Sequence, residues 1–163
     1  MSECCSVKAG ESSTPSAMTC PECGSRSKKV ETLTVKSLVR HVPFNMPPAQ
    51  YYFCESPDCD LVYFASHSAA PSFHRADLLV RVGVKEKVDP IPICYCFGVS
   101  RKDLWEEVER TGKSTLAGKI RAEVKAGNCA CELKNPSGKC CLGNVTRIVQ
   151  EGLRIVHAPP ARE

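Results

Sequence analysis

Residues 94–96 read Cys94-Tyr95-Cys96, and further cysteines follow at Cys131 and in the pair Cys140-Cys141. Four thiolates can hold an iron–sulfur cluster, and the two irons of a [2Fe–2S] core share them equally. We expect Cys94 and Cys96, which are one residue apart, to bind one iron. Cys131 and one member of the Cys140-Cys141 pair would bind the other. The segment therefore predicts a [2Fe–2S]-binding domain that the rest of the chain supports.

Cys141 is favoured over Cys140 as the fourth ligand because a helix is expected to begin there and to end before Gly152. Free backbone N–H groups and the positive end of a helix dipole stabilise an anionic centre and lower a thiol pKa. Hydrogen bonds and charge at this helix terminus would therefore support the cluster.

Two more helices are expected between the cluster cysteines. The first begins after Ser100, with Asp103 three residues on as the partner in a short capping box, and it stops at Gly112. The second runs from Leu116 to about Gly127 and has an apolar residue at every fourth position. This half of the chain is therefore predicted to be helical.

The first half of the chain contains a second set of cysteines. Cys20-Pro21-Glu22-Cys23-Gly24 is typical of a zinc knuckle, and Cys54 and Cys59 bracket a second tight loop. Two such loops can complete a tetrahedral four-cysteine site, which is the closed form typical of structural zinc. A redox-active iron of the rubredoxin type, held by the same four sulfurs, is the alternative.

Short β-prone runs surround these loops. Loose alternation over 30–39 suggests strands, the runs 51–53 and 61–65 flank the second loop, and 78–84 could form one more strand. The fold class expected is α+β, with a small zinc-ribbon β domain packed on a small helical [2Fe–2S] domain. The proposed division is a disordered tail over 1–18, a zinc-ribbon-like domain over 19–89, a helical cluster domain over 90–155 and a tail over 156–163.

Composition decides between metal ligands and disulfides for the 12 cysteines of this 163-residue chain. The first residues contain no apolar leader, and no apolar run is long enough to cross a membrane. We therefore expect a cytoplasmic protein without membrane insertion, whose thiols stay reduced and bind metal. The formal charge of +4 is offset if two anionic metal centres are filled, so nucleic acid is not expected as a partner.

Four cysteines fall outside the two ligand sets, namely Cys4, Cys5, Cys129 and Cys140. They are expected either to be inert thiols or to capture a soft metal ion such as Cu⁺, which prefers thiolates. Thr111 to Thr115 has the ending of a phosphate-binding loop, but Glu107 stands where that pattern requires glycine. A helix–helix connection is therefore expected there rather than a nucleotide site.

Several of these motifs together resemble the N-terminal domain of CopZ-type copper chaperones, over about residues 18 to 155. The matching stretches are Cys94-Tyr95-Cys96, Asn135-Pro136-Ser137-Gly138-Lys139-Cys140-Cys141, Cys20-Pro21-Glu22-Cys23 and Arg81-Val82-Gly83-Val84-Lys85-Glu86. The resemblance implies zinc at Cys20, Cys23, Cys54 and Cys59, and a [2Fe–2S] cluster at Cys94, Cys96, Cys131 and Cys141. It also implies an electron-transfer and metal-handling protein, rather than a classical enzyme, that reduces Cu(II) to Cu(I).

CopZ proteins of this type continue into a copper-binding domain with its own C-x-x-C loop, which is not found before Glu163. The expected partners are therefore a separate copper chaperone or copper-transporting ATPase, together with an electron donor. Two other functions stay open at this point. One is a ferredoxin-like adaptor or cluster carrier without a copper role, and the other is a non-redox zinc-ribbon module that binds nucleic acid or protein.

Overall fold

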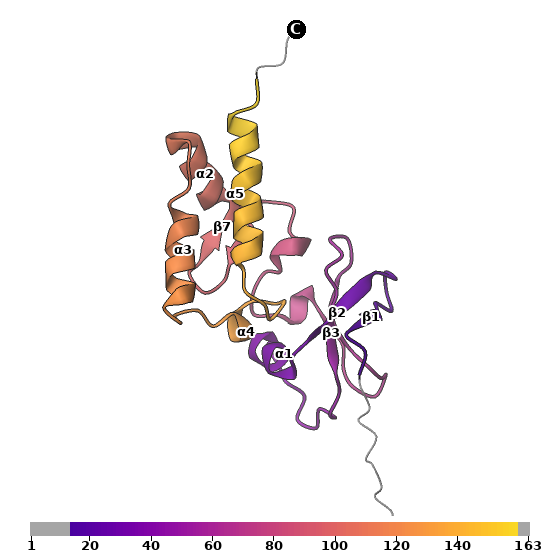
Figure 1. Cartoon of the computed structure of the whole chain (residues 1–163). Helices are drawn as coiled ribbons and strands as arrows, with labels where there is room; N and C mark the ends of the chain where they lie inside the picture. The colour runs from indigo at the N-terminus through magenta and orange to yellow at the C-terminus, as the bar shows by residue number, and fades with distance from the viewer. Residues whose placement is uncertain (1–13, 160–163) are drawn as a thin grey trace, which may run out of the picture.

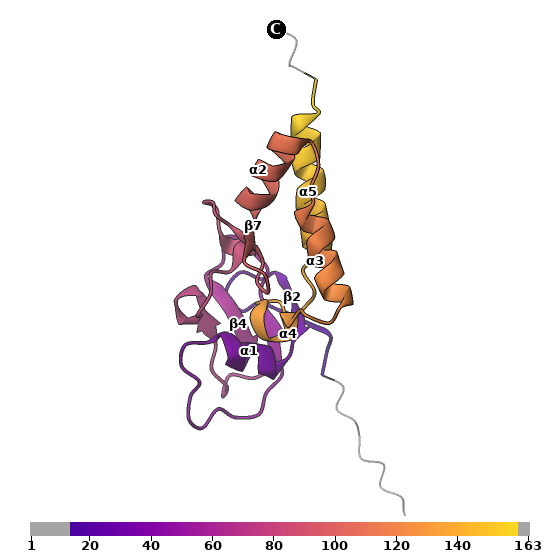
Figure 2. The same cartoon turned by 90° about the vertical axis from the view of Figure 1, so that its left-hand side faces the viewer.

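The computed structural model describes residues 14–159 as a mixed α and β structure, which confirms the predicted class. An antiparallel sheet lies at one end, and at the other α2 (Arg101–Thr111) and α3 (Leu116–Lys125) pack along α5 (Leu142–Val156) (Figures 1 and 2). The short helices α1 (Thr32–Leu38) and α4 (Cys131–Lys134) contact each other between these two parts. The division into a zinc-ribbon domain and a cluster domain stays a prediction.

Five strands form the larger sheet, in sequence order and each antiparallel to the next. They are β1 (Ala17–Thr19), β2 (Arg26–Val30), β3 (Tyr51–Phe53), β4 (Leu61–Ala65) and β5 (Phe73–His74). The strands predicted at 51–53 and 61–65 are confirmed. Every residue of β3 is buried, and its aromatic rings pair with those of β4 and β5, so the sheet buries side chains on both faces.

The predicted disordered tail over 1–18 is wrong at its end, because β1 begins at Ala17. Ala17 pairs with Lys28 and Met18 with Ser27. Residues 1–13 lie outside the described part of the chain, and with them Cys4 and Cys5.

The strand prediction for 30–39 is wrong beyond Val30, because α1 (Thr32–Leu38) follows β2 directly. The residues that α1 buries are Thr34, Val35 and Leu38, whose spacing is that of one helical face. The β-branched residues suggested a strand, but burial on one helical face outweighs that propensity.

The strand predicted at 78–84 is also wrong. Leu78 forms one isolated bridge with Val39, and a 3₁₀ turn, η2 (Gly83–Lys85), follows after a bend. Gly83 lies so close to the Pro92 carbonyl that a Cβ atom would be 2.1 Å from its oxygen. This close approach leaves no room for a side chain at Gly83. Another 3₁₀ turn, η1 (Arg75–Asp77), lies directly before Leu78.

The helical part begins with a two-stranded sheet, β6 (Pro92–Cys94) and β7 (Val99–Ser100). It continues with α2 (Arg101–Thr111), α3 (Leu116–Lys125), α4 (Cys131–Lys134) and α5 (Leu142–Val156). The predicted ends of α2 are confirmed: Ser100 and Asp103 form a capping box, and Gly112 ends the helix with φ 72°. Isoleucines, leucines and valines of this part form a core separate from that of the sheet.

The prediction that the last helix ends before Gly152 is wrong, because α5 continues to Val156. Gly152 lies against the Trp105 ring, and a Cβ atom there would be 2.8 Å from Cδ1. The Trp105 indole N–H also donates to the Ile148 carbonyl at 3.1 Å. This glycine therefore allows α2 and α5 to approach closely and does not end the helix.

Two buried hydroxyl groups of the sheet part donate to backbone carbonyls of the helical part. Thr34 Oγ1 lies 2.7 Å from the Glu132 carbonyl, and Tyr63 Oη lies 2.5 Å from the Pro136 carbonyl. Both acceptors belong to the segment between Cys131 and Cys141. Across the described residues, no helix combines the length and the apolar character needed to cross a membrane.

The Gly152–Trp105 contact predicts opposite effects for two glycine substitutions in one helix. Gly152→Ala should lower the free energy of unfolding by about 1–3 kcal/mol, because the added methyl overpacks the α2–α5 contact. Gly143→Ala is the matched control, since nothing lies within 4 Å of its Cβ position. It should raise stability by up to about 1 kcal/mol through helix propensity. Urea unfolding followed by circular dichroism measures both, and equal effects would contradict the packing explanation.

Candidate metal centres

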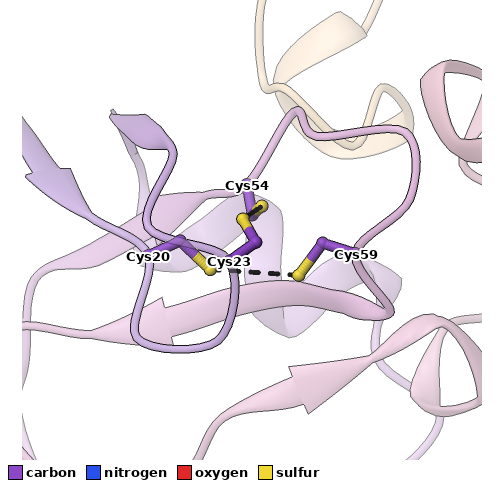
Figure 3. A group of neighbouring side chains, drawn as sticks. All are labelled: Cys20, Cys23, Cys54 and Cys59. Carbon is purple, nitrogen blue, oxygen red and sulfur yellow. Dashed lines mark hydrogen bonds between the residues drawn. The ribbon is translucent and has the colours of Figure 1, made fainter.

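The first cysteine group consists of Cys20, Cys23, Cys54 and Cys59, and their sulfurs all lie within 4.8 Å of one another. Two loops supply them, one after β1 and one between β3 and β4, and the sulfurs point toward a common centre (Figure 3). The predicted grouping of these four residues is confirmed. Cys23 is exposed, and the other three are buried.

Local backbone hydrogen bonds shape the first loop. The Cys20 N–H donates to the Ser25 carbonyl at 2.8 Å, and the Gly24 N–H donates to the Cys20 carbonyl at 3.0 Å. Gly24 adopts φ 74°, a conformation that residues with a side chain rarely take. These constraints turn the chain so that Cys20 and Cys23 face the same point.

The sulfur spacing fits a zinc ion. Zn–S bonds of about 2.3 Å in a tetrahedron place the sulfurs about 3.8 Å apart. The Cys20–Cys59 sulfur distance is 4.0 Å and the Cys23–Cys54 distance is 3.6 Å. Four protein sulfurs leave no position open for a substrate, so the donor set suits a structural ion.

The thiols of this group differ in pKa. Contacts with the Ser25 hydroxyl and backbone lower the pKa of Cys23 to about 6, whereas burial raises that of Cys59 to about 12. Burial also raises the pKa of Cys54. Because zinc binds thiolates, loading the buried sulfurs must displace their protons.

Two charged residues beside this group carry no signal in the sequence. Lys85 is buried and its ammonium donates to the Ser56 and Cys59 carbonyls, whereas its neighbour Lys87 is exposed. Glu22 lies between the knuckle cysteines, with one oxygen 2.6 Å from His74 Nε2 and the other 3.9 Å from Cys59 Sγ. Only the folded chain distinguishes Lys85 from the exposed charges around it.

The second cysteine group consists of Cys94, Cys96, Cys131 and Cys141, and the structure brings its sulfurs together in two close pairs. Cys94 Sγ lies 3.3 Å from Cys141 Sγ, and Cys96 Sγ lies 3.6 Å from Cys131 Sγ. These pairs differ from the expected arrangement, in which Cys94 and Cys96 share one side. Cys141 immediately precedes α5, as its choice as a ligand required.

Burial and hydrogen bonding also distinguish the sulfurs of the second group. Cys94, Cys131 and Cys141 are buried and Cys96 is half-buried, with the Ala130 N–H donating to its sulfur at 3.2 Å. The hydrogen bond from the Cys141 thiol lowers the pKa of Cys94 to about 6 and raises that of Cys141. Burial raises the pKa of Cys131 to about 12. The four sulfurs therefore lie as two pairs within the hydrophobic cluster of the helical part.

Two further cysteines among residues 14–159 are not part of either group. Cys129 is half-buried near Cys131, and Cys140 is exposed beside Cys141. Cys4 and Cys5 lie outside the described residues. The role of all four as soft-metal thiols stays a prediction.

The segment that resembles a phosphate-binding loop is occupied by a carboxylate of the chain itself. Glu107 accepts hydrogen bonds from the Ser114 hydroxyl and the Thr115 N–H, both at 3.0 Å, and from the Leu116 N–H at 3.1 Å. It also bonds to the Thr115 hydroxyl. The Glu107 carboxylate therefore accepts the hydrogen bonds that a bound phosphate would accept at the start of α3. The expected helix–helix connection is confirmed.

The comparisons with known proteins agree on one family. A family model described as a zinc binding domain of the CopZ type matches residues 17–78. The copper chaperone CopZ of Archaeoglobus fulgidus is 37% identical over 131 residues, which make up 80% of this chain and 61% of that protein. The X-ray structure of the N-terminal domain of Archaeoglobus fulgidus CopZ matches with a TM-score of 0.65 and 34% identity, over 80% of this chain and 97% of that one.

The first cysteine group predicts a selective loss of metal on substitution. Cys54→Ser should abolish retention of zinc through gel filtration, because three sulfurs and a hydroxyl bind zinc far more weakly than four thiolates. Cys129→Ser, outside the group, should retain about one zinc per chain. Plasma mass spectrometry gives the zinc content, and full zinc in Cys54→Ser would contradict the site.

Glu107 predicts a pH-dependent contribution to stability. Burial raises the pKa of this carboxyl, but hydrogen bonds from Thr115, Leu116 and Ser114 outweigh it and hold the pKa at about 2. The charged form is favoured in the folded chain, so its contribution is complete above the unfolded pKa of about 4.3 and is lost as the pH falls through about 2. Glu107→Gln should therefore melt below the wild type at pH 7 and level with it at about pH 2.

The control for this prediction is Glu106→Gln. Glu106 is exposed and pairs only with Lys102, at 3.6 Å. Its substitution should shift the melting temperature little at any pH. A wild-type advantage over Glu107→Gln that persists unchanged at acid pH would contradict the assigned role.

Proposed function

The chain belongs to the CopZ family, and on that premise we propose that it handles copper with the help of two resident metal centres. Zinc occupies the first cysteine group, and a [2Fe–2S] cluster occupies the second. The protein passes single electrons, so that Cu(II) is reduced to Cu(I) before a copper chaperone or copper-transporting ATPase receives it. This places it in the cytoplasm, beside an electron donor.

The observation that carries the proposal is the pairing of sulfurs in the second cysteine group. Distances of 3.3 Å and 3.6 Å within the pairs, and the burial of three of the four residues, suit a dinuclear cluster. When bound, such a cluster supplies one-electron transfer at a potential tuned by hydrogen bonds to sulfur and by solvent exposure. The proposal gives the first group a structural role, because its four sulfurs leave no open position.

The chain's own residues determine where an electron can enter or leave. Cys96 is the half-buried member of its group, and Phe97 beside it is 37% exposed. The hydrogen bond from the Ala130 N–H favours negative charge on the Cys96 sulfur. A partner or a copper ion therefore approaches most closely at the loop that carries Cys96.

Copper itself is the substrate in this proposal. One Cu²⁺ ion gains one electron, which an external one-electron donor has supplied to the protein, and leaves as Cu⁺. The chain spans 61% of the length of the Archaeoglobus fulgidus chaperone. The proposal assigns receipt and delivery of Cu⁺ to a copper chaperone or copper-transporting ATPase. The exposed Cys140 is a candidate contact for Cu⁺ during the handover.

The test is metal analysis and an anaerobic visible spectrum of the purified full chain, followed by addition of Cu²⁺. We expect about two irons, two sulfides and one zinc per chain. Dithionite should bleach the sulfide-to-iron absorption, and Cu²⁺ should restore it while a Cu⁺-specific chelator reports about one Cu⁺ per chain. Cys94→Ser should abolish both signals, and Cys129→Ser should keep them.

Two outcomes would replace the proposal by the other functions. A colourless protein that holds zinc only, even after anaerobic cluster reconstitution, would favour a non-redox zinc-binding module. A cluster that moves intact to an acceptor protein but is not reoxidised by Cu²⁺ would favour a cluster carrier.

A further inference from the structure

Lys85 is the one charged side chain that is fully buried in the described part of the chain, with 1% of its surface exposed. Its ammonium donates to the Ser56 carbonyl at 2.8 Å and to the Cys59 carbonyl at 2.9 Å. Both acceptors belong to the loop that carries Cys54 and Cys59. Through these two hydrogen bonds, Lys85 holds the loop between Cys54 and Cys59, which is the second loop of the first cysteine group.

The ammonium of Lys85 lies against two backbone carbonyls rather than a carboxylate. Within residues 14–159 it forms no ion pair, whereas its neighbours Glu86 and Lys87 do. A buried ammonium without an anion is costly. Four thiolates outweigh the charge of one zinc ion, so the loaded group is anionic and gives Lys85 its missing counter-charge.

The same short segment also contacts the second cysteine group. Lys85 ends η2, and the N–H of the first residue of that turn, Gly83, donates to Tyr95 Oη at 2.8 Å. The Tyr95 hydroxyl in turn donates to the Arg81 carbonyl at 2.9 Å. Tyr95 lies in sequence between Cys94 and Cys96. Its hydroxyl therefore ties the Cys94–Cys96 loop to the turn that carries Lys85.

Further contacts hold η2 and the residues beside it in place. Glu86 accepts from Arg75 at 2.8 Å and from Arg81 at 2.7 Å. Gly83 lies against the Pro92 carbonyl with no room for a side chain. A cavity of about 250 Å³ lies between the two cysteine groups, and Phe53, Glu55, Tyr95 and Cys141 are among its lining residues. The turn η2 lines this cavity, and its hydrogen bond to Tyr95 connects the two groups in addition to the bond from Tyr63 to the Pro136 carbonyl.

We propose that Lys85 is a positioning residue that couples the two cysteine groups. Zinc in the first group fixes Lys85 and η2, and Gly83 and Tyr95 pass this restraint to the Cys94–Cys96 loop. The second group is thereby prepared for its own metal centre. The inference rests on the proposed function for the identity of that centre, and on the contacts above for the coupling.

The test uses the zinc-loaded full chain without cluster and measures two rates. One is transfer of zinc to a chromogenic chelator, and the other is alkylation of Cys96 by iodoacetamide, followed by mass spectrometry. Lys85→Met should speed both about tenfold, which is the usual effect of removing an outer partner of a metal ligand. Lys87→Met is the matched control, because Lys87 pairs with Asp58 of the same loop at the surface. It should change neither rate by more than about twofold.

Tyr95→Phe separates the two halves of the connection. It should leave zinc transfer at the wild-type rate and speed alkylation of Cys96 as much as Lys85→Met does. Tyr51→Phe is its control, since it removes a hydroxyl that donates to the Pro71 carbonyl, away from both groups. If Lys85→Met does not fold, as judged by circular dichroism, the Tyr95→Phe comparison decides the question alone.

Three results would overturn the coupling. They are unchanged zinc transfer in Lys85→Met, faster zinc transfer with unchanged Cys96 alkylation in the same variant, and unchanged alkylation in Tyr95→Phe. Neither rate depends on a cluster. If the variants show the expected rates of zinc transfer and Cys96 alkylation but the protein takes up no iron, the proposed function is therefore contradicted and the coupling still holds. In cluster-loaded protein, Lys85→Met and Tyr95→Phe should each also lose iron faster than their controls.

Discussion

The hydrogen bond from Tyr63 to the Pro136 carbonyl joins the sheet part of this protein, which carries the first cysteine group, to the helical part, which carries the second. Tyr63 lies in β4, which starts two residues after Cys59, and Pro136 lies between Cys131 and Cys141. The tyrosine is fully buried, and burial raises the pKa of its hydroxyl, so the group stays a donor. The strand that shapes the first cysteine group therefore also holds the segment that supplies half of the second.

The cysteine pattern made the two cysteine groups predictable, because spacing along the chain limits which sulfurs can meet. The cap at Ser100 and the stop at Gly112 were predictable for a similar reason, since capping is a local interaction. The failures at 30–39, at 78–84 and at Gly152 share another cause. In each, a contact with a distant element decides the conformation: the buried face of α1, the Pro92 carbonyl and the Trp105 ring.

Lys85 and the sulfur pairs of the second group show the same limit within the sites. The pairing of Cys94 with Cys141 depends on how β6 packs against the start of α5. The spacing of the cysteines along the chain does not determine this packing. Two small hydrophobic clusters each include cysteines of one group. Domains with small cores commonly need a metal ion to reach useful stability. Under the proposed function, metal loading and folding are therefore linked in this chain.

Only one sulfur of the first cysteine group, that of Cys23, reaches the surface. A competing thiol or chelator can attack the bound ion from that side alone, so Cys23 is the first ligand to be displaced. The other three sulfurs belong to buried residues and follow only when the two loops that carry them open. The lifetime of the ion is thus governed by the opening of these loops, whereas its affinity is governed by all four sulfurs. Under the proposed function, in which the protein meets soft, thiol-seeking ions, slow exchange lets it keep its own zinc even where a competitor binds sulfur more tightly.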